Sequence, residues 1–272
     1  MGTNFRFLTD NVARRYTLLA TAEETGYEAL HLADGNRNTT WRGTDVNPHT
    51  VTLDAGLGNT ETVDTVVLGG LAQLIAGGWI VDVEWSDDAI SSWTSVGSPF
   101  PLSPVTISHV AEPTLVDGWF EVSSVAKRAW RLSLSGSPTD VPALAEWALG
   151  VRYEVSKNPL YGASIGMARA VQGATFAFSW IPGTEAATIA LYTELLRMSP
   201  AYPAEMPAET VAGSVHGGRP GWLYDPLGFL LRKEATVTPA LMSVLWMNPD
   251  ATPVMEAPRY WRLGPTTFRQ LA

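Results

Sequence analysis

The residues whose types and spacing could do chemistry form a short polar run, Asp34-Gly35-Asn36 followed by Thr39. A tight Asp-Gly turn comes first, and it gathers carboxylate, amide and hydroxyl oxygens in one loop. Trp41 and an alternating segment ending in Asp54-Ala55-Gly56 come next. Oxygens gathered in this way could bind a cation. Asp and Asn side chains also cap their own backbone in turns, so a purely structural turn is the alternative.

Sequence patterns typical of catalysis are weak or missing. Gly162-Ala163-Ser164-Ile165-Gly166 has the letters of a nucleophile elbow, but it lies among small residues with no evident His and Asp partners, so we reject it. Four histidines occur without metal-type spacing and there is no cysteine, which argues against zinc. The carboxylate pairs Glu23-Glu24 and Asp87-Asp88 are adjacent at turns, where side chains diverge, unlike the opposed pair of a glycosidase. We therefore expect no enzymatic activity.

The chain holds 11 tryptophans, and tryptophan can stack on the apolar C–H faces of sugar rings. Trp93 and Trp119 lie near expected loops, which makes them the candidate glycan-binding residues. Packing in the core is the default for a tryptophan on an alternating strand.

The composition of the chain bears on which classes of partner it can bind. The 272 residues are 46% hydrophobic and 17% charged, and their net charge is −9. A negative chain whose nearest approach to a basic patch is Arg14-Arg15 argues against nucleic acid as a partner. No run approaches the ~20 apolar residues that cross a bilayer, so we expect no membrane insertion. Without cysteine or an apolar leader in the first 20 residues, the chain is expected to fold in a cytoplasm.

The elements that position these residues are mostly strands in the first half of the chain. Trp79 to Trp85 alternates, with Trp79, Val81, Val83 and Trp85 on one face and Ile80, Asp82 and Glu84 on the other. Ala129 to Ser135 alternates in the same way, and Thr62 to Leu68 is typical of a more deeply buried strand. Many short strands separated by turns predict a β-sandwich over residues 1–155.

The remainder, 156–272, is expected to be a smaller α+β domain with one main helix. Ala174 to Trp180 predicts a strand, and Thr184 is a candidate N-cap for a helix that extends to about Met198. Ala201 to Pro220 is rich in Pro, Gly and Ala and predicts an extended loop. Trp222 to Thr238 and Tyr260 to Leu271 predict further strands.

The first 150 residues resemble the discoidin-like family, which is also called galactose-binding-like or coagulation factor 5/8 C-terminal type. The resemblance depends on five segments in the family's order. They are Asp34 to Trp41, Thr52 to Gly56, Val81 to Trp93, Ala129 to Leu132 and Leu144 to Trp147. Two departures are Ala55 for the usual leucine and Ala89 near the position of a usual turn glycine. The resemblance implies a jelly-roll β-sandwich.

In that family the acidic loop often holds a structural Ca²⁺. The resemblance implies five ligands in this chain, namely Ala33 through its carbonyl, Asp34, Asn36, Thr39 and Glu146. Oxygen donors of these types suit Ca²⁺, which takes six to eight of them.

The whole chain also resembles a type of bacteriophage virion protein in which a segment like Leu8 to Thr17 leads into a discoidin-like domain and a smaller α+β part. This implies a non-enzymatic tail, baseplate or connector protein, assembled in the host cytoplasm and located in the virion. The implied partners are other virion proteins, further copies in a homo-oligomeric ring, and host-surface carbohydrate. The alternative is a carbohydrate-binding module of a bacterial protein.

Overall fold

The computed structural model describes residues 4–36, 38–97, 117–156, 158, 175–198, 220–226, 240–247 and 252–270. The fold is mainly β, and this confirms the expected fold class. The chain divides into two compact units, Asp10–Val151 and a second unit made of Met1–Thr9 together with Arg152–Ala272. Each unit has its own hydrophobic core.

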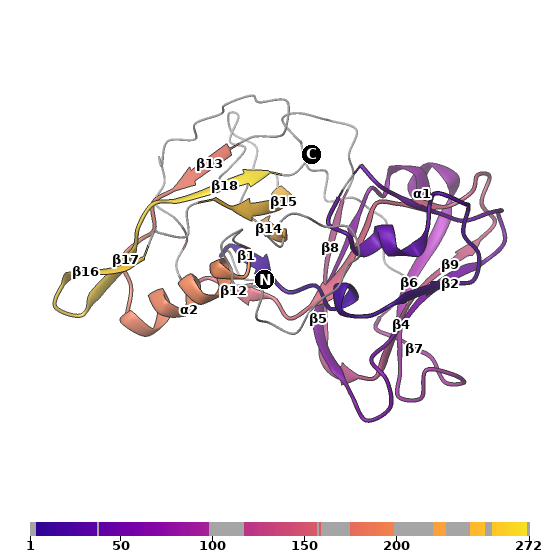
Figure 1. Cartoon of the computed structure of the whole chain (residues 1–272), viewed down its shortest axis with the longest axis horizontal. Coiled ribbons are helices and arrows are strands. Elements are labelled where there is room, and N and C mark those ends of the chain that lie inside the picture. The colour runs from indigo at the N-terminus through magenta and orange to yellow at the C-terminus, as the bar shows by residue number, and fades with distance from the viewer. Residues whose placement is uncertain are drawn as a thin grey trace. The chain divides into compact units, whose positions relative to one another are not determined.

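Asp10–Val151 forms a β-sandwich whose larger layer is a five-stranded antiparallel sheet (Figure 1). In spatial order its strands are β2 (Leu18–Ala20), β4 (His49–Asp54), β9 (Ala129–Gly136), β6 (Trp79–Ser86) and β7 (Thr94–Ser95). The central strands β9 and β6 pair along their whole length, from Trp79 opposite Gly136 to Ser86 opposite Ala129.

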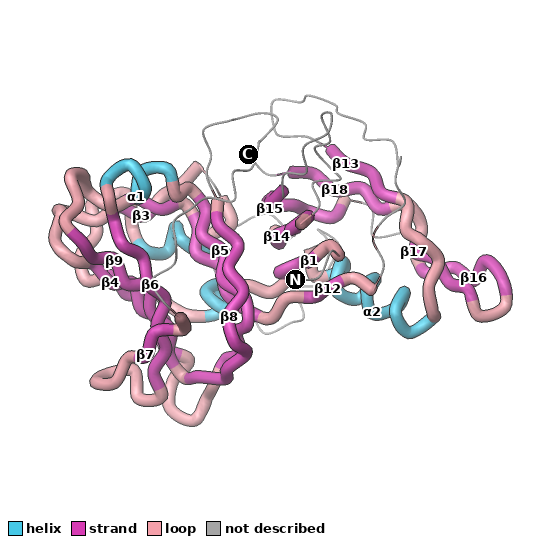
Figure 2. The backbone as a smooth tube through the Cα atoms, turned by 180° about the vertical axis from the view of Figure 1, so that it is seen from behind, coloured by secondary structure: helices cyan, strands magenta, loops and turns pink. Residues whose placement is uncertain are grey.

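The opposing layer is a three-stranded antiparallel sheet, and a short two-stranded pair completes the sandwich. The three strands are β11 (Glu146–Gly150), β5 (Glu61–Gly69) and β8 (Gly118–Lys127), and the pair is β10 (Ala143–Leu144) with β3 (Trp41–Arg42). Helices are short in this unit (Figure 2). They are the 3-10 helices η1 (Val12–Arg15) and η2 (Ala29–Ala33) and the helix α1 (Ala72–Gly77), which the sequence analysis did not anticipate.

Alternation along the strands builds the core between the two layers. Val81 and Val83 on β6 are fully buried, and so is Trp130 on β9, while Asp82 and Glu84 on the opposite face are only partly buried. The inward-facing residues of both layers form one hydrophobic cluster, which includes Trp147 of β11. The strand predictions for Trp79 to Trp85 and Ala129 to Ser135 are confirmed.

The described residues of the second unit form a six-stranded antiparallel sheet with one helix and a hairpin. In spatial order the strands are β12 (Tyr153–Glu154), β1 (Arg6–Leu8), β14 (Gly221–Asp225), β15 (Ala240–Trp246), β18 (Thr266–Gln270) and β13 (Thr175–Phe178). The helix α2 (Glu185–Leu196) lies beside the hairpin of β16 (Pro253–Ala257) and β17 (Tyr260–Leu263) (Figure 1).

The position of β1 differs from the expectation that residues 1–155 form one domain. Phe7 of β1 faces Leu223 of β14 on one side and Tyr153 of β12 on the other. Phe5 and Phe7 are buried in the second core, where Phe7 stacks on Phe268. The first nine residues therefore belong to the second unit, because their apolar side chains complete its core.

Local signals in the second half are largely confirmed. The Thr184 hydroxyl accepts a hydrogen bond from the amide of Ala187 (3.2 Å) at the start of α2, as an N-cap does. The expected strand over Tyr260 to Leu271 is two strands, β17 and β18, since Gly264 and Pro265 interrupt it. The loop expected over 201–220 and the strand end expected over 227–238 lie outside the described residues, apart from Pro220, and so does the rejected elbow at 162–166.

Candidate functional site

The acidic turn after η2 is closed by hydrogen bonds among its own residues. One Asp34 carboxylate oxygen accepts the Asn36 amide (2.7 Å) and the other accepts the Thr39 hydroxyl (2.6 Å). The Asn36 side-chain oxygen accepts the amide of Asn38 (3.1 Å). These bonds are those of a turn capped by its own Asp and Asn. Asp34, Asn36 and Thr39 therefore lie together in one hydrogen-bonded turn.

The two ligands expected from outside this turn are both bonded to Arg14 of η1. Its Nε donates to the Ala33 carbonyl (3.1 Å), and its Nη2 donates to Glu146 Oε1 (3.0 Å). The Arg14 side chain is 8% exposed and that of Glu146 is 1% exposed. This arrangement does not fit Ca²⁺, because a positively charged guanidinium is bonded to two of the five expected donors. Within the described part of the chain, no group of three or more His, Asp or Glu side chains could hold a metal ion.

The two candidate tryptophans lie in different surroundings. Trp119 on β8 is 7% exposed, and its indole N–H donates to Glu121 (3.3 Å). A ring that is buried cannot offer a face to a sugar, so the structure corrects the expectation for Trp119. Trp93 precedes β7, is only partly buried, and lies beneath the guanidinium of Arg131, 4.2 Å from the ring centroid.

Trp93 borders the polar outer face of the five-stranded sheet. Arg131 of β9 lies opposite Glu84 of β6 and donates to its Oε2 (2.7 Å), and Glu84 lies opposite Ser95 of β7. The Ser95 hydroxyl in turn donates to Asp82 Oδ1 (2.7 Å). We call Asp82, Glu84, Trp93, Ser95 and Arg131 the polar face. It combines one aromatic ring with carboxylates, a hydroxyl and a guanidinium, which are the groups that hydrogen-bond sugar hydroxyls.

Part of the polar face was visible in the sequence. The alternation of β6 already placed Asp82 and Glu84 on the outer side of a strand. The alternation of β9 likewise places Arg131 on the outer side, but its pairing with Glu84 and its stacking on Trp93 are long-range contacts that no local pattern predicts.

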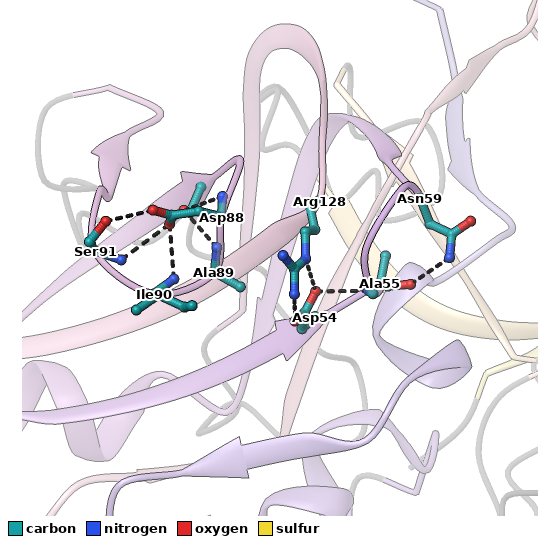
Figure 3. Close-up of polar contacts among 10 residues, drawn as sticks. Asp54, Ala55, Asn59, Asp88, Ala89, Ile90, Ser91 and Arg128 are labelled. Atoms are coloured by element: carbon teal, nitrogen blue, oxygen red, sulfur yellow. Dashed lines mark hydrogen bonds and ion pairs between the residues drawn. The ribbon is translucent and has the colours of Figure 1, made fainter.

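The turn between β6 and β7 is organised by one carboxylate, as Figure 3 shows. Asp88 Oδ1 accepts the amides of Ile90 (2.9 Å) and Ser91 (3.1 Å), and Oδ2 accepts the Ser91 hydroxyl (2.5 Å). The hydrogen bond from Ser91, with those from Ile90 and Ser86, holds the pKa of Asp88 well below its usual range. Ala89 in this turn has φ of 63°, which is the left-handed region that favours glycine.

Replacement of Ala89 by glycine is expected to stabilise the protein. The left-handed conformation costs an L-residue about 1–2 kcal/mol, and glycine recovers part of this against its greater freedom in the unfolded chain. We expect Ala89→Gly to raise the free energy of unfolding by about 0.5–1 kcal/mol, measured by chemical denaturation. Ala126→Gly on the exposed face of β8, where φ is not positive, is the matched control and should lower stability. Equal losses in both variants would contradict the strain at Ala89.

A second group of polar contacts links the turn after β4 to the turn between β8 and β9. Arg128 binds Asp54 with two hydrogen bonds, Nε to Oδ1 (2.8 Å) and Nη2 to Oδ2 (2.7 Å), and the Asn59 side chain donates to the Ala55 carbonyl (3.0 Å) (Figure 3). The hydrogen bond from Arg128 lowers the pKa of Asp54 below its ordinary value.

This lowered pKa predicts a pH dependence of stability. A carboxyl whose pKa is lower in the folded state contributes stability above its unfolded-state pKa of about 3.9, and that stability is lost as the pH falls through the folded-state value. We therefore expect Asp54→Asn to lower Tm by a few degrees near neutral pH, with the difference from the native chain closing in acid. The measurement is Tm against pH for the native chain, Asp54→Asn, Arg128→Met and the double variant. A Tm difference between the native chain and Asp54→Asn that stays constant down to acid pH would contradict a stabilising pair of Asp54 with Arg128.

No carboxyl with a shifted pKa in the described residues is suited to act as a neutral acid. The pKa values of Glu28, Asp45, Asp54 and Asp88 are all lowered, in each case by hydrogen bonds to the ionised form. A general acid at neutral pH needs a raised pKa. These four carboxyl groups are therefore ionised acceptors of hydrogen bonds in their turns.

Two further findings concern a cavity in the second unit and the helices of the chain. A cavity under α2, lined among others by Tyr153, Trp180 and Leu191, has a volume of about 20 Å³, which is room for a water molecule and no larger ligand. In the part of the chain that the structure describes, neither helix combines the length and apolar character that crossing a bilayer requires.

Comparisons with known proteins show similarity to solved structures only. No family model matches the chain, and no curated protein matches it. A pectin binding carbohydrate binding module matches with a TM-score of 0.38 and 13% identity over 50% of this chain and 89% of that one. Chitosan-binding module 1 from a Paenibacillus sp. IK-5 chitosanase/glucanase matches with a TM-score of 0.39 and 18% identity over 52% and 99%.

A family 29 fucosidase of Ruminococcus gnavus in complex with fucose matches with a TM-score of 0.38 and 14% identity, over 53% of this chain but 27% of that one. At these values the matches carry no inference about a ligand. The function has to be argued from the residues of this chain.

Proposed function

We propose that this protein is a non-catalytic carbohydrate-binding protein and that the polar face of its sandwich is the binding surface. The observation that carries the proposal is the combination of Trp93, Arg131 and Glu84 at one edge of that face. The guanidinium fixes one side of the indole, and the partly exposed ring is available to the apolar C–H face of a sugar. Glu84 and Asp82 add acceptors for sugar hydroxyls on the same strand.

Rigidity supports this proposal. Arg131 is held by Glu84, and Ser95 is held by Asp82, so the groups are oriented before a ligand arrives. A surface that is already ordered loses less conformational entropy on binding.

The test is binding of the full chain to a glycan array, followed by titration with the best ligand. We expect Trp93→Ala to reduce affinity at least tenfold with little change in Tm, because the ring is partly exposed. Arg131→Ala should weaken binding less, since it releases the ring without removing it. Lys127→Ala is the matched control, because Lys127 stacks on a different indole, that of Trp85 (3.6 Å). Undiminished binding by Trp93→Ala, or no glycan bound by the native chain, would refute the proposal.

A second candidate function is a structural subunit of a bacteriophage virion that contacts further copies of itself. Exposed apolar side chains in the second unit favour it. They are Ile189 on α2, Val254 and Met255 on β16, and Tyr260 on β17. The outer side of α2 also carries the small apolar residues Ala186 and Ala190, beside the exposed Glu185 in its first turn.

Sedimentation velocity over a range of concentrations tests this second candidate. A closed oligomer that Met255→Lys converts to a monomer would favour the assembly role. A monomer at all concentrations that still binds glycan would favour the first proposal.

A further inference from the structure

The residues around Arg14 bring together segments that are far apart in the sequence. Arg14 lies in η1, Ala33 ends η2, and Glu146 begins β11. All three lie within the sandwich unit, and the guanidinium bonds both partners. One positive group therefore joins three segments of the chain.

Each partner offers what a cation needs. Glu146 contributes a buried carboxylate, and Ala33 contributes a backbone carbonyl at the end of a helix, where the helix dipole is negative. A buried carboxylate is costly unless a positive group or several hydrogen bonds compensate it. Arg14 supplies that compensation with an N–H on each acceptor, and a guanidinium keeps its charge at every pH that proteins meet.

The neighbouring turn is satisfied without an ion. Both carboxylate oxygens of Asp34 accept hydrogen bonds inside the turn, and the single Thr39 hydroxyl proton is shared between two acceptors within 2.6 Å, Asp34 Oδ2 and the Asn36 carbonyl. A Ca²⁺ ion bound by this turn would have to compete with these bonds and approach a guanidinium of like charge. The oxygens that would bind Ca²⁺ are therefore already bonded. Those of Asp34, Asn36 and Thr39 are bonded within the turn, and the Ala33 carbonyl and Glu146 Oε1 are bonded to Arg14.

We infer that the Arg14 guanidinium is the built-in cation of this sandwich, joining η1, η2 and β11 in the role that the family resemblance gives to Ca²⁺. The fold then needs no metal at this position. The inference concerns stability and is independent of whether the polar face binds sugar.

The first test uses the native full chain with Ca²⁺ as the probe. After treatment with EGTA, Tm is expected to be the same with and without millimolar Ca²⁺, a concentration that reaches even weak protein sites. Isothermal titration with CaCl₂ alone is expected to give no binding heat. A rise of Tm with Ca²⁺, a fall with EGTA, or saturable binding heat would overturn the inference.

The second test removes the guanidinium. Arg14→Met is expected to lower Tm by several degrees more than Arg15→Met, the matched control. Arg15 lies in the same 3-10 helix but is one-third exposed and pairs with Asp10 and Glu61. Arg14→Lys should recover only part of the loss, because one ammonium lacks the planar fork that reaches both acceptors.

Equal stability of Arg14→Met and Arg15→Met would overturn the inference. If Arg14→Met does not fold at all, Arg14→Lys against Arg15→Lys gives the same comparison with the charge retained.

Discussion

A fragment of residues 152–272 is expected not to fold, whereas a fragment of residues 10–151 is expected to unfold cooperatively by itself. The first fragment lacks β1, which lies between β12 and β14 and is hydrogen-bonded to both. Phe5, Phe7 and Leu8 of this segment are buried, and each such side chain contributes about 1.5–3 kcal/mol. Their sum rivals the 5–15 kcal/mol that stabilises a typical domain.

The second fragment keeps every strand of both sandwich layers, since all of them lie between Leu18 and Gly150. Circular dichroism and denaturant unfolding of the two fragments measure the difference. Residues 1–9 rejoined to the end of 152–272 through a flexible Gly-Ser linker should restore a cooperative transition. A cooperative transition of 152–272 without them would show that β1 is dispensable and would restore the boundary near residue 155.

Truncation of Trp147 is expected to cause a large loss of stability in the sandwich. Trp147 is fully buried on β11 and belongs to the core between the two layers. Trp147→Ala should lower the free energy of unfolding by about 3–5 kcal/mol, because it removes a large apolar surface and leaves a cavity. Such a loss takes a large part of the stability of a domain of this size.

Trp147→Phe separates packing from hydrogen bonding at the same position. In the described part of the chain the indole N–H of Trp147 has no acceptor, so phenylalanine removes an unsatisfied polar group as well as some volume. We expect a loss of about 1–2 kcal/mol for this variant, measured by denaturant unfolding of the fragment 10–151. Equal losses for Ala and Phe would mean that the N–H is bonded and that packing is not the main contribution.

The candidate sites show where reasoning from sequence succeeds and where it ends. The turn chemistry of Asp34, Asn36 and Thr39 was foreseen, and so was the outward orientation of Asp82 and Glu84 on β6. Arg14 was counted only as part of a pair too small to bind nucleic acid. Trp119 was named as a candidate glycan-binding residue with core packing as the default for a tryptophan on a strand, and on β8 it is buried.

What the sequence determined by itself is local. Alternation with a period of two marks β6 and β9 because neighbouring side chains on a strand must point to opposite faces. Thr184 marks the start of α2 because the first amides of a helix need an acceptor nearby in the chain. These preferences act over a few residues, so they can be detected wherever they occur.

What only the tertiary structure decided is which distant segments meet. The strand β1 leaves the sandwich for the second sheet, and Arg14 lies 132 residues before the carboxylate of Glu146 that it compensates. Such pairings depend on the burial of apolar surface and charge between segments that carry no mutual signal in the sequence. The physical reason is that packing is a property of the assembled core and not of any one segment.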